Sequence, residues 1–198
     1  MKQQPLGNFS KGLVFVLSAP AGTGKTTLVS MLKEEFSCIE ESVSSTTRNS
    51  RVCEEDGRDY FFVTHEEFQK SLVNEEFLEY SEVFGNLYGI SKKQLQQKID
   101  SGKHVFLVID TQGVVHLKKI AFNAVYIFLA PPSIEVLRDR LKKRQTEDEA
   151  KQIERLSWAE KEMSRSYMYD YLIINDDLNV AYSVLKSILI AEEHKIVK

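Results

Sequence analysis

The sequence predicts a three-layer α/β protein built on a mostly parallel sheet, and three observations carry this prediction. Short apolar runs alternate along most of the chain with segments whose apolar residues have helical spacing. A glycine-rich turn joins the first apolar run to the first helical segment. A polar, β-rich stretch interrupts the alternation. We therefore expect a single domain over residues 1–198, in which a core (12–41, 91–143 and 168–192) carries an insertion (42–90) and a helical segment (144–167).

Length and composition favour a globular protein. The 198 residues are enough to bury a core, and 42% hydrophobic with 28% charged residues is an ordinary balance. The net charge of -3 provides no overall basic field for nucleic acid. The two cysteines and four histidines lack the spacing of a disulfide framework or a metal site.

The first 21 residues superficially resemble a signal peptide, but cleavage there would remove the first strand and divide the glycine-rich turn. No apolar stretch approaches the ~18 residues of a membrane span. We expect a cytoplasmic protein that binds neither nucleic acid nor membrane.

The segment LVFVLSAPAGTGKTTLVS predicts a strand, a loop and a helix, and it carries a phosphate-binding pattern. The template G-x-x-x-x-G-K-[ST] is matched in its last three positions, whereas Ala19 replaces its first glycine. Gly22 and Gly24 can adopt positive φ, which turns backbone N–H groups toward a phosphate beside the helix N-terminus. Lys25 can reach the β- and γ-phosphates, and Thr26 can offer a hydroxyl to Mg²⁺. The alternative, a glycine-rich turn with a surface lysine, fits this strand–loop–helix context less well. We therefore expect a P-loop fold whose nucleotide-binding residues are Ala19, Pro20, Ala21, Gly22, Thr23, Gly24, Lys25, Thr26 and Thr27.

The remaining elements are predicted from the spacing of apolar residues and from the prolines and capping residues that mark the ends of helices. In the insertion, YFFV predicts a strand, HEEFQKSLV a short helix, and FLEYSEVFGNLYGI an extended piece. The α/β alternation then resumes, with Pro131-Pro132 opening one helix and NDDL capping the last. The expected strands are at 13–18, 104–110, 124–129 and 171–174, and the expected helices at 25–36, 91–100, 113–120 and 133–143. Two more helices are expected: one follows RQTEDE and ends at about 167, and the other follows NDDL and ends at about 191.

Several ordered motifs make this chain resemble the guanylate kinases, a family of nucleoside monophosphate kinases. The motifs are SAPAGTGKTT, SVSSTTRNSR, GRDYFFV, EEFLEY, GNLYG, IDTQGV, APPS, RQTEDE and NDDL, and the resemblance extends from about Leu13 to Ala191. It implies transfer of the γ-phosphoryl group of ATP to GMP or dGMP with Mg²⁺, by a monomer or homodimer. It also implies that the phosphate loop binds ATP, that the β-rich insertion is a GMP-binding subdomain, and that residues 144–167 form a helical lid over both.

The resemblance gives Glu79 the role of reading guanine, and the chemistry agrees. Guanine presents two adjacent donors, N1–H and the 2-amino group, to one carboxylate, whereas adenine would leave that carboxylate unpaired at a cost of ~1–3 kcal/mol. Ser44 matches the hydroxyl that donates to guanine O6. The alternative, a solvated Arg/Glu face of a hairpin, is disfavoured by the joint order of the motifs. The residues that match the GMP-phosphate site are Arg48, Arg51, Tyr60 and Tyr88, and arginine suits it because its planar fork pairs two oxygens.

Four further positions are assigned by the resemblance. Asp110 matches an acidic residue near Mg²⁺ and the acceptor, although an Asp at a strand end is often only a turn residue. Arg144 and Arg155 match lid arginines, and with Lys25 and Arg48 they would be catalytic. Asn175 matches an adenine-side contact, and a helix N-cap is an equally good interpretation.

The chain departs from the family pattern in places. Ile90 stands where Thr or Ser usually contacts guanine, so one hydrogen bond of ~0.5–1.5 kcal/mol is missing, and Ile90→Thr is predicted to lower the KM for GMP. Val108 replaces a common acidic residue, Cys53 a glycine near Arg51, and Gln145 a glycine in the lid. A catalytically silent guanylate-kinase-like protein-binding module is the alternative function, and the retained Gly24-Lys25-Thr26 argues against it.

Overall fold

The computed structural model of the chain describes residues 4–143 and 149–196. Its larger sheet has five parallel strands in the order β2-β7-β1-β8-β9. This order puts the first strand at the centre, between β7 and β8. The strands are β1 (Val14–Ser18), β2 (Ile39–Glu41), β7 (His104–Val108), β8 (Val125–Ala130) and β9 (Tyr171–Ile174).

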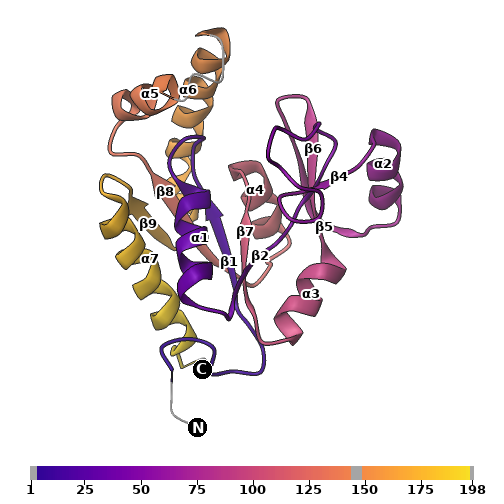
Figure 1. Cartoon of the computed structure of the whole chain (residues 1–198), viewed down its shortest axis with the longest axis vertical. Helices are drawn as coiled ribbons and strands as arrows, with labels where there is room; N and C mark the ends of the chain where they lie inside the picture. The colour runs from indigo at the N-terminus through magenta and orange to yellow at the C-terminus, as the bar shows by residue number, and fades with distance from the viewer. Residues whose placement is uncertain (1–3, 144–148, 197–198) are drawn as a thin grey trace.

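Helices cover both faces of this sheet and complete the three predicted layers (Figure 1). Alternate side chains of a strand point to opposite faces, so Phe15 and Leu17 of β1 pack with one helical layer and Val14 and Val16 with the other. The helices on the first face are α1 (Lys25–Glu35) and α7 (Leu178–Glu193), and those on the second are α3 (Lys92–Asp100) and α4 (Thr111–Lys119).

The insertion forms a second sheet of four strands in the order β4-β3-β6-β5. A tight turn joins β5 to β6, and their last pair is Val83 with Asn86. A capping box between Thr64 and Glu67 starts the helix of this region. The elements are β3 (Ser45–Thr46), β4 (Phe61–Phe62), α2 (His65–Val73), β5 (Phe77–Val83) and β6 (Asn86–Ser91).

In the described part of the chain between β8 and β9 there are two further helices and a 3₁₀ turn. In Figure 1, α5 and α6 lie at the upper left of the large sheet, and the small sheet with α2 lies to its right. No helix among the described residues is long and apolar enough to cross a membrane. The elements are α5 (Ile134–Lys143), α6 (Glu149–Ser164) and η1 (Ser166–Met168).

The predicted fold class is confirmed, and the differences are local. Strands β2 and β3 were not expected, and the predicted strand at 60–63 is shorter, at Phe61–Phe62. Strand β7 ends at Val108 rather than at Asp110, because the Asp110 side chain caps α4. Helix α4 therefore begins at Thr111, two residues before the prediction.

Candidate nucleotide-binding cleft

The phosphate loop connects β1 to α1 and has the backbone expected of it. Gly22 and Gly24 have φ values of 89° and 101°, in the left-handed region that favours glycine. The Thr23 hydroxyl donates to the Pro20 carbonyl at 2.8 Å, which closes the loop on itself. The Lys25 ammonium donates to the Ala19 carbonyl at the mouth of the loop. A phosphate bound here would meet the N-terminal N–H groups of α1 together with this lysine.

Asn175, at the end of β9, holds the loop from the other side. Its side chain is 4% exposed, and its Nδ2 donates to the Thr23 carbonyl at 2.7 Å. The N-cap interpretation of Asn175 is wrong, because the Asp177 carboxylate caps α7 by accepting from the backbone N–H groups of Asn179 and Val180 at 2.8 and 3.0 Å. A Cβ on Gly24 would lie 2.8 Å from the Asn175 Nδ2, so the loop and Asn175 fit closely.

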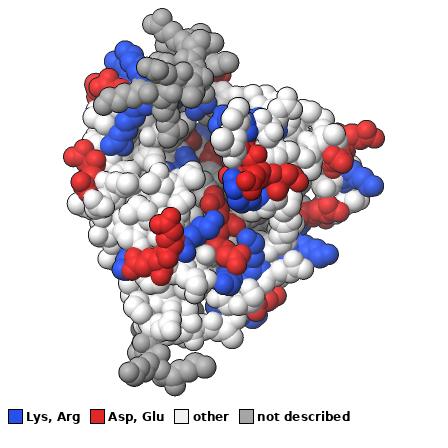
Figure 2. Space-filling view, viewed as in Figure 1, with Lys and Arg blue, Asp and Glu red and all other residues white. Residues whose placement is uncertain are grey.

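Residues from the loop and the start of α1, from the insertion, from the end of β7 and the two residues after it, and from α6 line one cleft of about 310 Å³. Figure 2 shows this face of the molecule, where charged side chains of both signs gather around a hollow. The predicted residues that line the cleft are Ala19, Ala21, Lys25, Thr26, Ser44, Arg48, Arg51, Tyr60, Glu79, Tyr88, Asp110 and Arg155. The predicted residues outside its lining are Pro20, Gly22, Thr23, Gly24, Thr27 and Asn175, and Arg144 and Gln145 lie outside the described residues.

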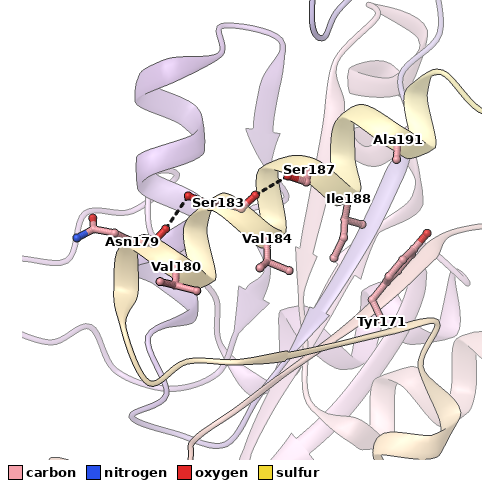
Figure 3. Close-up of a pocket in the computed structure, with 8 residues that line it drawn as sticks. All are labelled: Tyr171, Asn179, Val180, Ser183, Val184, Ser187, Ile188 and Ala191. Carbon is pink, nitrogen blue, oxygen red and sulfur yellow. Dashed lines mark hydrogen bonds between the residues drawn. The ribbon is translucent and has the colours of Figure 1, made fainter.

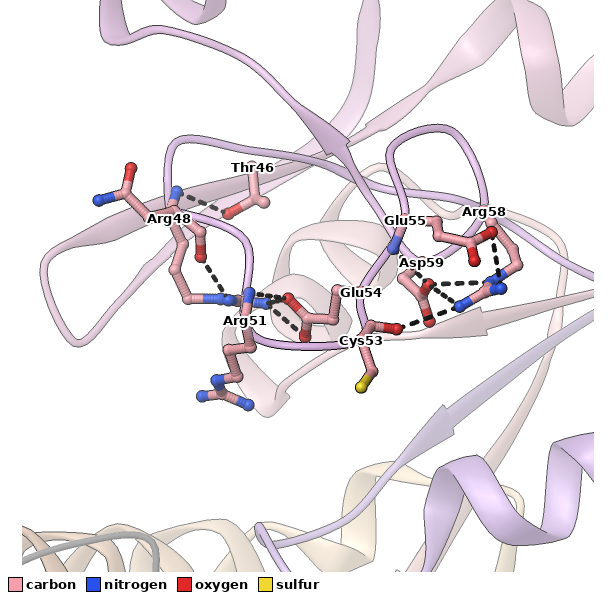
Figure 4. Close-up of polar contacts among 9 residues, drawn as sticks. Thr46, Arg48, Arg51, Cys53, Glu54, Glu55, Arg58 and Asp59 are labelled. Atoms are coloured by element: carbon pink, nitrogen blue, oxygen red, sulfur yellow. Dashed lines mark hydrogen bonds and ion pairs between the residues drawn. The ribbon is translucent and has the colours of Figure 1, made fainter.

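On the insertion side of the cleft, Arg48 is paired with an acidic side chain (Figure 4). Its Nη2 lies 2.9 Å from both carboxylate oxygens of Glu54, which also accepts from the Arg51 backbone N–H at 2.8 Å. The guanidinium carbon lies 5.3 Å from the centroid of the Tyr60 ring. Glu54 thus holds Arg48 at the position where a phosphate would compete for it, while the Arg51 side chain extends away from the pair (Figure 4).

Glu79 of β5 is buried in the cleft wall. It is 2% exposed, and its Oε2 has no hydrogen-bond partner among the described residues. Burial, with a smaller contribution from the nearby Asp110 carboxylate, raises the pKa of Glu79 to about 8. A Cβ on Gly113 of α4 would lie 2.6 Å from this Oε2, so only glycine leaves room for the carboxylate.

Asp110 lies at the junction of β7 and α4. Its Oδ1 accepts from the backbone N–H groups of Gln112 and Gly113 at 2.8 and 2.9 Å, which fixes the carboxylate. Its Oδ2 is buried and has no hydrogen-bond partner in the described part of the chain. The turn-residue interpretation is therefore incomplete, because Asp110 also presents an unsatisfied oxygen to the cleft.

Among the described residues, the cleft lining includes seven that the sequence analysis did not assign to the site, and three of these are aromatic or charged. The seven are Ser81, Val83, Phe84, Val108, Ile109, Trp158 and Glu162. Trp158 and Glu162 lie on α6 at helical spacing from Arg155, so one face of this helix points into the cleft, and that spacing was the available signal. Glu162 is 8% exposed, and burial raises its pKa to about 7 against the opposing effect of Lys25. The third, Phe84, lies in the turn between β5 and β6.

A second hollow, of about 590 Å³, lies between β9 and α7 (Figure 3). It is larger than the cleft, but none of the described side chains that line it is charged, and the phosphate loop is elsewhere. The chemistry of nucleotide phosphates therefore points to the smaller, charged cleft.

Comparisons with known proteins agree with one another. A family model described as guanylate kinase matches residues 11–192. A guanylate kinase of Protochlamydia amoebophila (strain UWE25) is 48% identical over 192 residues, which is 97% of each chain. One of Chlamydia trachomatis serovar D is 47% identical over 183 residues, covering 92% of this chain and 89% of that protein. The crystal structure of guanylate kinase from Anaplasma phagocytophilum matches with a TM-score of 0.75 at 36% identity, covering 97% of this chain and 90% of that one.

Proposed function

The chain belongs to the guanylate kinase family, and on that premise we propose that its cleft transfers the γ-phosphoryl group of ATP to GMP and dGMP, giving ADP and GDP. One observation carries this proposal: a phosphate loop with Lys25 and a buried carboxylate, Glu79, line the same cleft. The loop suits the triphosphate of a donor, and the unpaired carboxylate suits a base with two adjacent donors.

The acceptor nucleotide would occupy the insertion side of the cleft. Glu79 would accept from guanine N1–H and the 2-amino group, and Ser44 would donate to O6. The GMP phosphate would replace Glu54 as the partner of Arg48, since both are bidentate anions for the same guanidinium. The other groups proposed for this phosphate are Arg51, Tyr60 and Tyr88, which line the same part of the cleft.

The donor nucleotide would bind through the phosphate loop, which Asn175 supports from β9. The residues present also fit a magnesium ion: Thr26 lines the cleft beside Lys25, and the buried Asp110 Oδ2 lacks a partner among the described residues. Mg²⁺ commonly binds through one or two protein oxygens together with phosphates. Thr26 and Asp110 would hold it, and when bound it would neutralise charge on the β- and γ-phosphates.

Transfer then needs alignment and positive charge more than acid–base chemistry. The GMP phosphate is already an anionic nucleophile, so no general base is required. Lys25 and Arg48, together with the lid arginines Arg144 and Arg155, would stabilise the charge on the transferred group. The lid and the insertion would exclude water from the cleft, which would prevent hydrolysis of ATP.

The division into core, GMP-binding insertion and lid is part of the proposal. So are the oligomeric state, a monomer or homodimer, and the cytoplasmic location.

The test is an assay of ADP release with ATP and Mg²⁺, in which GMP, dGMP, AMP, UMP and dTMP are compared as acceptors. We expect rapid turnover with GMP and dGMP and little with AMP. Lys25→Ala should lower kcat about 10²–10³-fold while circular dichroism and the melting temperature stay those of the wild type. Preference for another acceptor would overturn the reading of Glu79. Binding of GMP without any turnover would favour the silent module.

A further inference from the structure

The turn between β5 and β6 has an unusual residue at its first position. Val83 and Asn86 form the last pair of the hairpin, and the two residues between them, Phe84 and Gly85, have φ values of 50° and 74°. Two consecutive left-handed residues make the kind of tight turn that strongly favours Asn-Gly. A phenylalanine in this conformation is strained, and strain of this kind persists where another interaction needs the side chain.

The Phe84 ring contacts two side chains of α6 on the opposite side of the cleft. Its centroid lies 5.7 Å from that of Trp158, with the rings tilted at 54°, and 5.5 Å from the guanidinium carbon of Arg155. The ring is still 42% exposed, so burial in the hairpin does not explain its presence. All three residues line the cleft.

We propose that Phe84 is a positioning residue for the transfer step: its ring seats Arg155 and docks α6 against the insertion. A ring face attracts the flat face of a guanidinium, whereas phosphate oxygens bind its N–H edge, so both contacts can form together. Phe84 would thus hold Arg155 over the transferred phosphoryl group and keep the cleft closed. This inference rests on the role proposed above for Arg155.

The test replaces Phe84 with the residue that the turn prefers. In Phe84→Asn we expect a melting temperature equal to or above that of the wild type, because the turn strain is relieved, together with a kcat about 3- to 30-fold lower. The KM for GMP should change much less, because the ring contacts no group proposed to bind the base. Phe84→Tyr keeps the ring and should restore kcat. Phe84→Gly, which also suits the turn, should behave as the Asn variant does.

Trp158 provides a second readout, since it is the single tryptophan of the chain. Loss of the ring in Phe84→Asn should shift its emission to longer wavelength and weaken the change on adding GMP with a non-hydrolysable ATP analogue. Tyr80→Asn is the matched control: Tyr80 is a half-exposed aromatic residue of β5 outside the cleft lining, and its loss should alter neither kcat nor emission.

Arg155→Ala separates this inference from the function on which it rests. If Arg155→Ala lowers kcat and Phe84→Asn does not, the inference about Phe84 is wrong and the proposed function stands. If Arg155→Ala leaves kcat unchanged, the role of Arg155 fails, and the inference fails with it. If both single variants lower kcat, their double variant should lose little more than Arg155→Ala alone, because the two act through one contact. Full additivity would overturn the inference.

Discussion

If Glu79 reads guanine as proposed, its carboxyl group would couple base recognition to pH. Burial raises its pKa from 4.5 to about 8, so the ligand-free protein holds it neutral at pH 7, whereas guanine needs the carboxylate. GMP binding should therefore release a proton, and the KM for GMP should fall as the pH rises from 6 to 8. In Glu79→Gln we expect a KM about 10- to 100-fold higher without this dependence, because the amide cannot accept both donors. Steady-state kinetics at several pH values test this, and a KM that stays pH-independent in the wild type would contradict it.

The same group also has a stability consequence. Because the pKa is raised in the folded state, the unfolded state loses the Glu79 proton at lower pH than the folded state does. The stabilisation that comes from the neutral Glu79 side chain is therefore fully present below pH 4.5 and is lost as the pH rises toward 8. Glutamine stays neutral throughout this range. The unfolding free energy of Glu79→Gln relative to the wild type, measured by urea denaturation without ligand, should therefore increase between pH 5 and 8 and then level off.

Ile90 lies opposite Glu79 across β5 and β6, and it is also a core residue with 1% exposure. Directly paired residues share a face of the sheet, so a hydroxyl at position 90 would lie near the carboxylate proposed to read guanine. Ile90→Thr is therefore predicted to lower the KM for GMP and also to lower the unfolding free energy by ~1–3 kcal/mol, because an ethyl group of the core is replaced by a hydroxyl. Ile90→Val is the control. It should lower the unfolding free energy less than Ile90→Thr does, and it should not lower the KM for GMP. A KM for the Thr variant that is unchanged or higher would reject the prediction.

At the scale of elements, the phosphate loop depends on β9 as well as on α1. Removing the hydrogen bond from Asn175 leaves the buried Thr23 carbonyl without its donor. We expect Asn175→Ala to lower the unfolding free energy by about 1–3 kcal/mol and to raise the KM for ATP more than that for GMP. Asp177→Ala is the matched control, because it removes the cap of α7 at a cost of about 0.5–2 kcal/mol without touching the loop. Equal KM changes in the two variants would show that general destabilisation is the cause.

Elements were predictable where local pattern decides them. Strands β1, β7, β8 and β9 of the large sheet are apolar runs, and side chains cap the N-termini of α3, α4 and α7, so the type of these elements and their order along the chain follow from the sequence. The short strands β2, β3 and β4 have only three, two and two residues, and pairing with distant segments holds them in place. A pattern of period two cannot be read from so few residues.

At the scale of the whole molecule, the fold class was predictable and the far wall of the cleft was not. Motifs predicted the phosphate loop and the insertion side of the cleft, because the residues of each are read along one stretch of chain. Phe84, Trp158 and Glu162 became cleft residues only through the packing of α6 across the molecule. The helical spacing of Trp158 and Glu162 from Arg155 indicates which face of α6 is involved, but it does not indicate which distant element that face meets.

The two halves of the cleft should also bind a single compound that spans them. The phosphate loop and the insertion side line one hollow, so we expect a compound that joins adenosine and guanosine through a chain of phosphates to occupy both proposed sites at once. Its second half then binds at a high effective concentration. We expect this compound to raise the melting temperature more than GMP and a non-hydrolysable ATP analogue do together at the same concentrations. Lys25→Ala should reduce this shift to about that of GMP alone, since it weakens the donor half. If the joined compound stabilises the wild type no more than GMP does, the two nucleotides do not share this cleft.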